Sequence, residues 1–590
     1  MATTETIKTF FQDVNVTPSD PVLKKCLEIC HKYNVDAEDF VDQWLAYTAS
    51  NANGAIPTIE ELTKMERKEF QKQNKESFVP KKNVQSTPSR ISNIIENDLE
   101  SSALVNSYGG GTPKSNKNFN NVRTPDHPRR LQSTSLNFES QETTNIYSSP
   151  AQTKSQSNAY SQRSDSRAVL CTHGDPTATY TRTDDIQLFV RMFGDEEHSL
   201  TSKSKYMYEI MGSKARYLSI MTEWLGDFML KKHNLTLSEG SLKSFTGPMT
   251  TFGRIVSDSD GKINVQSTLL EGSQLVNFAH TVSLNLNKVP KYSLFPGQVV
   301  MVEGNNAHNG TFFADKIISD ALPTLPLEPP NFYGTMQIMI ASGPFTLPSN
   351  LSYEPLNDLL KYAAEYQPHL LILLGPFLDT DHEGILNGQL TDPFVSFFES
   401  LIENIAVTLQ DVDTQVVIVA SSKDAHHDPV YPTPPYCTRG AYEKIRFVPD
   451  PCMLDVNGLV IGATSADVLF DISNFELYQD RNPSGPVDRL GRLASHLLQQ
   501  QSFYPLYPPS KDMCIDHELL EQHGFIEYIP HILILPSTLR YFIKNISGCL
   551  VINPERSTKG YGAGTFAKVE IKSGTSNSIC SRASCQILRV

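Results

Sequence analysis

The sequence lacks an excess of positive charge. Its 590 residues include 51 lysines and arginines against 65 aspartates and glutamates, which gives a formal net charge of −14. Nonspecific affinity for nucleic-acid phosphates depends on clustered cations, so this composition argues against such binding as the main activity. The composition still allows local basic patches on the surface.

Long apolar runs are also missing. The longest are short segments such as Leu370–Leu374, Val416–Ala420 and Ile532–Leu535, whereas a membrane-spanning helix needs about 20 apolar residues. The opening MATTETIKTF is polar and contains a glutamate, so we expect no secretory signal in it.

Paired cysteine motifs are absent as well. The nine cysteines are scattered, and none forms a Cys-x-x-Cys pair. The spacings Cys26/Cys30 and Cys580/Cys585 are too wide for a zinc knuckle pair. An odd number of scattered cysteines favours buried, reduced thiols, so we expect the protein in the cytosol or nucleus.

Residues 1–78 are predicted to form a small helical domain. Apolar residues recur there at steps of three and four, which is typical of amphipathic helices: Val22, Leu23, Cys26, Leu27, Cys30 and Tyr33, then Phe40, Val41, Trp44 and Leu45. Asp36 is placed to cap the second helix, and Thr58 with Glu61 has the spacing of a capping box for a third. Such a module with no visible catalytic group is most often an interaction domain.

Residues 79–166 have a different composition, rich in Ser, Thr, Asn, Gln and Pro. So few apolar residues cannot offset the entropy of ordering, so we expect a disordered tether. Four proline-directed positions are candidate phosphorylation sites, namely Thr87, Thr112, Thr124 and Ser149. The alternative is that Ser/Thr-Pro pairs are simply common in linkers.

Residues 167–328 are predicted to form an OB-type β-barrel preceded by a helix over 204–234. Short strand-like segments alternate with turns after that helix: 252–256, 276–282, 298–303 and 311–317. Such a barrel can bind single-stranded DNA through aromatic platforms. Since Phe252, Tyr292, Phe312 and Phe313 have few basic neighbours, core packing is the better interpretation of these rings.

Residues 329–590 are predicted to form an α/β layered domain. Continuously apolar short strands alternate there with helices, the strands at 336–341, 370–374, 416–420, 459–461, 532–535 and 550–552, and the helices at 355–365, 393–408 and 487–500. Ligands of such sheets bind at the carboxyl ends of the strands. The residues that follow each strand are therefore the candidate site.

The loop Gly375–Asp379 indicates the kind of scaffold. Metal-dependent phosphoesterases of the calcineurin-like superfamily carry Gly-Asp-x-x-Asp at such a loop, and this stretch resembles that motif with Pro376 in place of the first Asp, leaving Asp379. The other ligand positions hold residues that are equally unsuited to a two-metal centre, namely Ser342, Pro344, Ser422, Lys423, Ser537 and Leu539. We therefore expect an inactive phosphoesterase-like domain with no catalytic residue, metal or cofactor.

One acidic and histidine-rich cluster keeps a displaced metal site open as an alternative. Two strand-end loops carry potential ligands that would share one sheet edge, Asp379, Asp381, His382 and Glu383 on one, and Asp424, His426, His427 and Asp428 on the other. Charged residues on exposed loops are more often solvated or paired.

Several long motifs carry a wider resemblance. YSLFPGQVV (292–300), ASGPFT (341–346), GPFLDTDHE (375–383), KDAHHDPVYPTPP (423–435), FYPLYPP (503–509) and NPERSTKGYGAGTFA (553–567) resemble the B subunits of eukaryotic DNA polymerase alpha. The likeness spans about residues 170–590 in order, while the first 166 residues fit more loosely. Glu555 departs from the family, which more often has glycine there.

The resemblance implies an OB barrel fused to an inactive phosphoesterase domain in a non-catalytic nuclear subunit. It also implies docking onto the zinc-bearing C-terminal region of the catalytic subunit, contact with primase and DNA through the complex, and recruitment of replication-fork proteins by the N-terminal domain. A metal-dependent phosphoesterase and a freestanding single-strand DNA binder are the alternatives.

Two proline- and tyrosine-rich loops are candidate partner-contact surfaces. They carry Tyr431 and Tyr436, and Tyr504 and Tyr507. Rigid aromatic loops lose little entropy on binding. The alternative is that these tyrosines pack against the chain's own domains.

Overall fold

The computed structural model describes residues 160–590, except 195–198, 239–241, 243–246, 260, 307–309, 327, 484 and 486, and part of residues 4–65. The chain divides into two compact units, Met1–Asn145 and Ile146–Val590. Within the described residues, no helix has the length and apolarity to cross a membrane. The candidate phosphorylation sites Thr87, Thr112, Thr124 and Ser149 lie outside these residues, as does the predicted cap Asp36.

The first unit contains helix α2 (Asp20–Tyr33) and helix α4 (Ile59–Met65). The stripe predicted from three- and four-residue spacing faces a shared core that includes Cys26, Cys30 and Trp44. The helical prediction therefore holds for the part of this unit that the structure describes.

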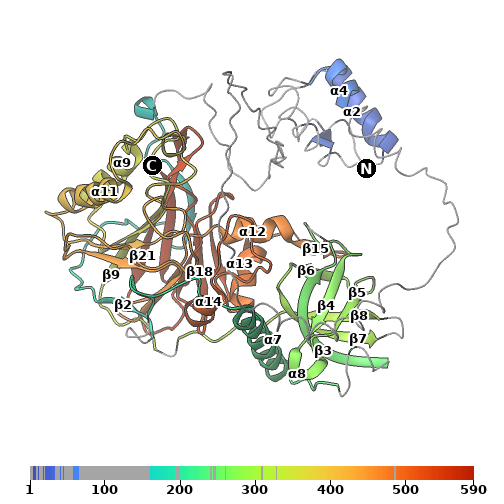
Figure 1. Cartoon of the computed structure of the whole chain (residues 1–590). Helices are drawn as coiled ribbons and strands as arrows, with labels where there is room; N and C mark the ends of the chain where they lie inside the picture. Colours follow the sequence, from blue (N-terminus) through green and yellow to red (C-terminus); the bar gives the residue numbers. More distant parts are fainter. Residues whose placement is uncertain are drawn as a thin grey trace, which may run out of the picture. The chain divides into compact units, whose positions relative to one another are not determined.

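The second unit contains a closed five-stranded barrel with strand order β3-β4-β5-β8-β7 (Figure 1). Its strands are β3 (Gly247–Ser257), β4 (Thr268–Gly272), β5 (Thr281–Asn285), β7 (Val299–Asn306) and β8 (Thr311–Ile318). The prediction of one strand over 276–282 is wrong in part, because Val276 lies in the short helix α8 (Gln274–Asn277).

The barrel's aromatic residues are mostly core residues. Phe252, Tyr292 and Phe312 have at most 5% of their surface exposed, and only Phe313 is half-buried. Three of the four rings considered as a DNA-stacking platform are therefore buried. Helix α7 (Met211–His233) packs its buried side on the barrel, with Leu225, Met229 and Phe252 in one cluster.

Two sheets face each other in the rest of the unit. The first is seven-stranded, in the order β1-β22-β21-β9-β10-β11-β12, and the second is six-stranded, in the order β17-β18-β16-β14-β13-β2. The strands of the first sheet are β1 (Val169–His173), β9 (Thr335–Ser342), β10 (Leu370–Leu374), β11 (Gln415–Val419), β12 (Ile445–Val448), β21 (Thr565–Lys572) and β22 (Ala583–Arg589). Those of the second are β2 (Val190–Met192), β13 (Cys452–Val456), β14 (Leu459–Ala463), β16 (Ile532–Ile534), β17 (Phe542–Ile546) and β18 (Cys549–Asn553).

Helices cover the outer face of each sheet, which makes four layers. On β10, Ile372 and Leu374 point into the core between the sheets, while Leu371 and Leu373 point to the helices on the other face. Burial on both faces explains why these strands are continuous apolar runs. The covering helices are α9 (Glu354–Tyr366) and α11 (Phe394–Thr408) on the first sheet, and α12 (Val468–Phe475), α13 (Arg489–Gln499) and α14 (His517–His523) on the second.

Short elements complete the unit. They are the 3₁₀-helix η5 (Tyr160–Gln162), helix α10 (Glu383–Leu386), and the strand pairs β6 (Lys291–Leu294) with β15 (Leu477–Asp480) and β19 (Thr558–Lys559) with β20 (Gly562–Ala563). Because β6 pairs with β15, a strand of the barrel region is joined to the layered region.

The predicted boundaries differ from the structure at three places. Strands β1 and β2 lie at the edges of the two sheets, so residues 169–192 belong to the layered region and not to the barrel domain. Ordered contacts also begin before residue 167, since Arg163 donates hydrogen bonds to Asp358 and to the carbonyl of Val590. The helix predicted over 204–234 starts at Met211 and ends at His233.

Candidate functional site at the strand ends

The loops that follow the central strands meet at one edge of the two sheets. Strands β9, β10 and β11 are parallel neighbours in register, so their carboxyl ends lie together. The loop after β18 joins them, because the amide of Ser557 donates to the carbonyl of Ser342 at 2.7 Å. The sequence prediction that these loops share an edge is confirmed.

The first loops pack directly on one another. A Cβ on Gly343 would lie 1.9 Å from the carbonyl oxygen of Pro376, and one on Gly375 would lie 2.8 Å from a carboxylate oxygen of Asp424. Only glycine allows such an approach. Pro376 therefore fills the space between the ends of β9 and β10.

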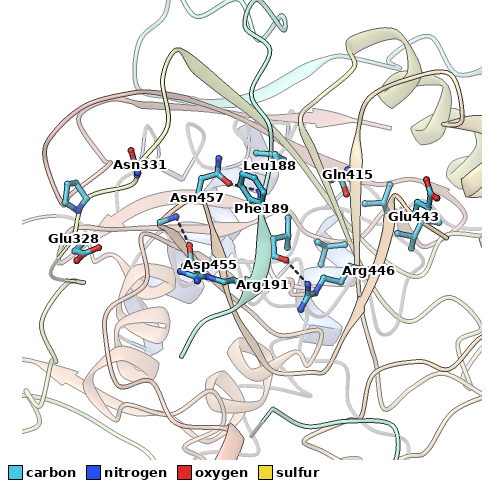
Figure 2. A pocket seen from close by; sticks show the side chains of 16 residues that line it. Leu188, Phe189, Arg191, Glu328, Asn331, Gln415, Glu443, Arg446, Asp455 and Asn457 are labelled. Carbon is cyan, nitrogen blue, oxygen red and sulfur yellow. Dashed lines mark hydrogen bonds and ion pairs between the residues drawn. The ribbon is translucent and has the colours of Figure 1, made fainter. Parts of the chain in front are cut away.

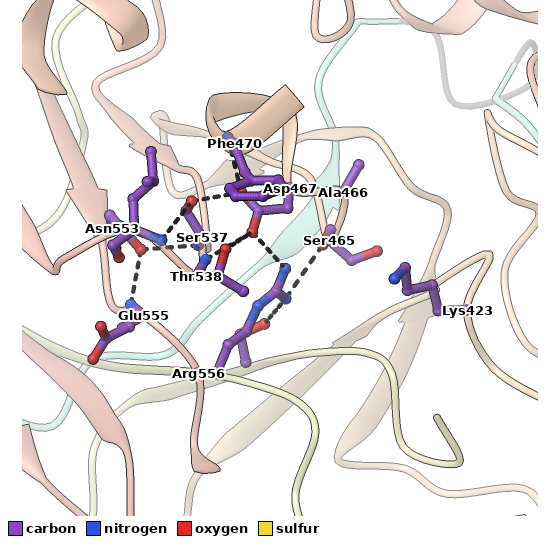
Figure 3. Close-up of polar contacts among 12 residues, drawn as sticks. Lys423, Ser465, Ala466, Asp467, Phe470, Ser537, Thr538, Asn553, Glu555 and Arg556 are labelled. Carbon is purple, nitrogen blue, oxygen red and sulfur yellow. Dashed lines mark hydrogen bonds and ion pairs between the residues drawn. The ribbon is translucent and has the colours of Figure 1, made fainter. Parts of the chain in front are cut away.

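Arg556 places a cation among these strand ends (Figure 3). Its Nη1 donates to the hydroxyl of Ser342 at 3.0 Å and lies 3.4 Å from the carbonyl oxygen of Ser465. Its Nη2 is 3.8 Å from a carboxylate oxygen of Asp467. The guanidinium therefore lies beside the carboxylate of Asp467 at this edge of the sheet.

Asp467 is the main acceptor at this edge. It accepts hydrogen bonds from the hydroxyl of Ser537 at 2.5 Å and from the amide and hydroxyl of Thr538 at 2.7 and 2.9 Å. It also caps α12 through the amide of Phe470 at 3.1 Å. Ser537, which stands at a predicted ligand position, is thus a hydrogen-bond donor in a structural network.

The residues at the other predicted ligand positions also have packing or hydrogen-bonding roles within the chain. The carbonyl of Pro344 accepts from the hydroxyl of Thr558 at 3.0 Å, and Leu539 is fully buried. Ser422 is half-buried on the loop after β11. Lys423 lies apart from Arg556 and pairs with Asp381 at 3.2 Å.

Asp424 is a buried carboxyl group at this edge. It accepts from the amides of Phe377 and Leu378 at 2.8 and 2.6 Å and from the hydroxyl of Tyr436. Burial raises the pKa of Asp424 to about 7, against the opposing effect of these hydrogen bonds. Burial also raises the pKa of Asp379, which forms an isolated bridge with Asp424.

The histidines of the alternative metal cluster have separate partners. His382 caps α10 through the amide of Gly384 at 3.0 Å, and His427 Nε2 contacts the carbonyl of Pro434 at 2.7 Å. The ring of His426 stacks on Phe398 with centroids 3.8 Å apart, and burial lowers its pKa to about 3. Among the residues that the structure describes, no three His, Cys, Asp or Glu side chains are grouped to hold a metal ion.

The prediction that the tyrosine loops form a partner-contact surface is wrong for three of the four tyrosines. Tyr431, Tyr436 and Tyr504 have at most 4% of their surface exposed and pack in the chain's own cores. Their hydroxyls bond to interior partners such as Asp424 and Asp471, so these rings do not form a contact surface. Only Tyr507 is half-buried.

Sequence reasoning missed Arg556 and Asp467. Each follows a buried strand, β18 and β14, so position after a strand was the available signal. Glu555, next to Arg556, has a left-handed backbone with φ of 64°. That conformation favours glycine, which agrees with the glycine that the family more often has at this position. The amide of Glu555 donates to Asn553 at 2.8 Å and its carboxylate pairs with Lys559 at 2.5 Å.

A groove of about 1020 Å³ lies at the opposite end of the strands (Figure 2). It is lined by β2 on one side and by the starts of β11 and β12 on the other. Its two arginines are already bonded, Arg446 to the carbonyl of Val190 at 2.7 Å and Arg191 to Asp455 at 2.6 Å. None of the predicted site residues lines this groove.

Comparison with known proteins gives a consistent result along the chain. The family model for the DNA polymerase alpha/epsilon B subunit matches residues 338–544. The model for the N-terminal region of the DNA polymerase alpha B subunit matches 5–72, and the model for the OB domain of that subunit matches 217–320. The DNA polymerase alpha B subunit of Mus musculus is 32% identical over 94% of this chain and 93% of its own length. That of Drosophila melanogaster is 30% identical over 99% of this chain and 100% of its own length, and that of Schizosaccharomyces pombe is 33% identical over 62% and 67%.

Proposed function

The chain belongs to the family of DNA polymerase alpha B subunits, and we propose on that basis that it is a non-catalytic scaffold whose former active-site edge now serves stability. It is an accessory subunit of DNA polymerase alpha, with a role in DNA replication. The catalytic subunit is its partner in that complex.

One observation carries the proposal that the chain is non-catalytic. Arg556 sits among Ser342, Ser465 and Asp467, at the strand ends where a phosphoesterase would hold two metal ions. Two-metal catalysis needs anionic and imidazole ligands that converge on cations. A permanent guanidinium at this place opposes a dication by charge, while Pro376 offers no donor atom. The four-layer arrangement of two facing sheets between helices supports a phosphoesterase-like origin for residues 329–590.

The proposed main activity of the second unit is obligate binding to the C-terminal region of the catalytic subunit. Primase and DNA would be reached through the complex, and the helical domain in residues 1–78 would recruit replication-fork proteins. The nucleus is the proposed location, because DNA replication takes place there. The four Ser/Thr-Pro positions Thr87, Thr112, Thr124 and Ser149 are proposed as phosphorylation sites that regulate those contacts.

Capture by purified partner tests this function. The full chain and a variant lacking residues 1–145, which removes the first compact unit, are each expressed with the tagged C-terminal region of the catalytic subunit. Both should co-purify in equal amounts, and residues 1–78 alone should not. If residues 1–78 captured the catalytic subunit and the chain lacking residues 1–145 did not, the proposal that the second unit binds the catalytic subunit would be refuted.

A further inference from the structure

One lysine of the second unit is buried without an acidic partner. Lys568 lies within β21 and has 8% of its surface exposed. In the part of the chain that the structure describes it forms no ion pair, whereas Lys572 on the same strand pairs with Asp175 at 2.9 Å. Glu570, on the same face of the strand, accepts instead from the amide of Tyr180 at 2.9 Å. Buried lysines are seldom found without a partner, so the surroundings of this amine are informative.

Two tyrosine rings lie beside this amine in place of a carboxylate. Nζ of Lys568 is 3.5 Å from the ring centroid of Tyr366, at the end of α9, and 5.4 Å from that of Tyr180. A second cation is close by, because the guanidinium of Arg167 lies over the ring of Tyr362, and that ring stacks on Tyr366. Tyr366 is half-buried and Arg167 is exposed, so the amine lies just below the surface of the domain.

These surroundings favour the neutral form of the amine. Burial, and then the charge of Arg167, lowers the pKa of Lys568 from 10.5 to about 8, against the opposing effect of Glu570. The charge of Arg167 is shared with Glu365, which pairs with it at 2.8 Å. At pH 7.5 roughly a quarter of an amine with a pKa of about 8 is neutral, against roughly one part in a thousand for an amine at 10.5. A desolvated lysine beside another cation is an activated nucleophile.

We propose that Lys568 is an acylation site that takes a short, uncharged acyl group from a thioester. The lone pair of Nζ attacks the carbonyl carbon of the thioester, and an amide bond forms between the two atoms. The carbon–sulfur bond breaks, and the thiol leaves with the proton that the amine gives up. No atom is oxidised or reduced, so the step requires only the thioester as co-reactant. This proposal rests on the site alone and is independent of the proposed function.

The chemistry of the site selects the kind of acyl group. Acylation removes the charge that burial of Lys568 disfavours, and the planar amide that results can stack on the ring of Tyr366. An acyl group with its own carboxylate would instead bring an anion to the negative faces of the rings. The modification also removes the cation that lies between α9 and the segment that carries Tyr180.

Acetylation of the full chain by S-acetyl-N-acetylcysteamine, a small acetyl thioester, tests the proposal. Occupancy of each lysine is measured by mass spectrometry over a range of pH values, with Lys572 as the internal control, because it lies on the same strand and is 51% exposed. At pH 7.5 we expect Lys568 to react at least about tenfold faster than Lys572. The rate at Lys568 should level off above about pH 8, whereas that at Lys572, whose pKa is raised by the hydrogen bond to its acidic partner, should keep rising. The corresponding succinyl thioester should show no preference for Lys568.

One variant tests the role of the neighbouring cation. Arg167→Gln should slow acetylation of Lys568 at pH 7.5 several-fold and move the levelling-off to higher pH. Arg439→Gln is the matched control, since that side chain is 80% exposed and pairs with Glu399 at 3.8 Å, and it should leave the profile unchanged. Unchanged melting temperatures would show that both variants fold.

Three results would overturn the proposal. The first is acetylation of Lys568 no faster than that of Lys572 in the folded chain. The second is a preference for Lys568 that persists in urea, where the fold no longer distinguishes the two lysines. The third is a pH profile that Arg167→Gln leaves unchanged. Equal preference for the succinyl thioester would overturn the restriction to uncharged acyl groups.

Discussion

Nη1 of Arg556 donates a hydrogen bond of 3.0 Å to the hydroxyl of Ser342, a residue 214 positions earlier in the chain. Ser342 ends β9 in the first sheet, and Arg556 follows β18 in the second. This bond therefore ties the two sheets together at the edge where the strand ends of β9, β10 and β11 meet.

Removing this guanidinium should destabilise the second unit. Arg556→Ala would leave the hydroxyl of Ser342 and the carboxylate of Asp467 without one of their partners, at a cost of about 2–3 kcal/mol. Arg216→Ala is the control, since Arg216 pairs with Glu521 at 3.3 Å but is 66% exposed and should contribute under about 1 kcal/mol. Urea unfolding of both variants compares the two, and equal losses would contradict a special role for Arg556.

The central strands were predictable because burial on both faces makes each of them a continuous apolar run. Leu370–Leu374 is β10 in the structure, and the runs near Val416 and Ile532 are β11 and β16. Strands β1 and β2 were not predictable. Both lie at sheet edges with half-exposed side chains, so no apolar run marks them, and their partners lie hundreds of residues away.

The location of the candidate site could be predicted from the sequence, but the contacts that its residues make could not. Strand ends located the loops, and the motif predicted that Pro376 and Ser537 do not supply the carboxylate or imidazole ligands of a two-metal centre. The roles of Arg556 and Asp467 depend on contacts between distant loops, which leave no spacing signature. The prediction for the tyrosine loops failed for a related reason, because the sequence around Tyr431 and Tyr504 is the same whether their rings face a partner or the core.

The full chain should not hydrolyse phosphodiesters when manganese or magnesium is added. The predicted ligand positions hold Pro376, Ser537 and Lys423, and Arg556 adds a further cation at the strand ends. The measurement is release of nitrophenol from bis-nitrophenyl phosphate, with Asp379→Ala and His427→Ala as matched variants. Turnover in the wild-type chain that either substitution abolishes would reveal a working metal site.

The stability of the second unit should fall as pH rises from about 4 to about 7, in part because of Asp424. Burial raises its pKa in the folded state from 3.8 to about 7, so between these values the folded chain binds a proton that the unfolded chain has released. Asp424→Asn imitates the neutral form and should reduce this slope, with its largest relative gain above pH 7. Melting curves at several pH values test this against the exposed control Asp381→Asn. A slope equal to that of the wild type would show that Asp424 does not titrate as expected.

The seating of α7 on the barrel should depend on one glycine. A Cβ at Gly226 would lie 2.3 to 2.5 Å from ring carbons of Phe252, which is fully buried and cannot move aside. Gly226→Ala should therefore cost about 1–3 kcal/mol as an overpacked core does, although alanine favours helix. Gly212→Ala on the same helix is the matched control, since only a side-chain atom of Ile210 at 3.9 Å lies near its Cβ position. Thermal unfolding should show Gly212→Ala at or slightly above the wild type and Gly226→Ala several degrees below it. If both variants unfold with the wild type, the close contact between α7 and β3 is not a determinant of stability.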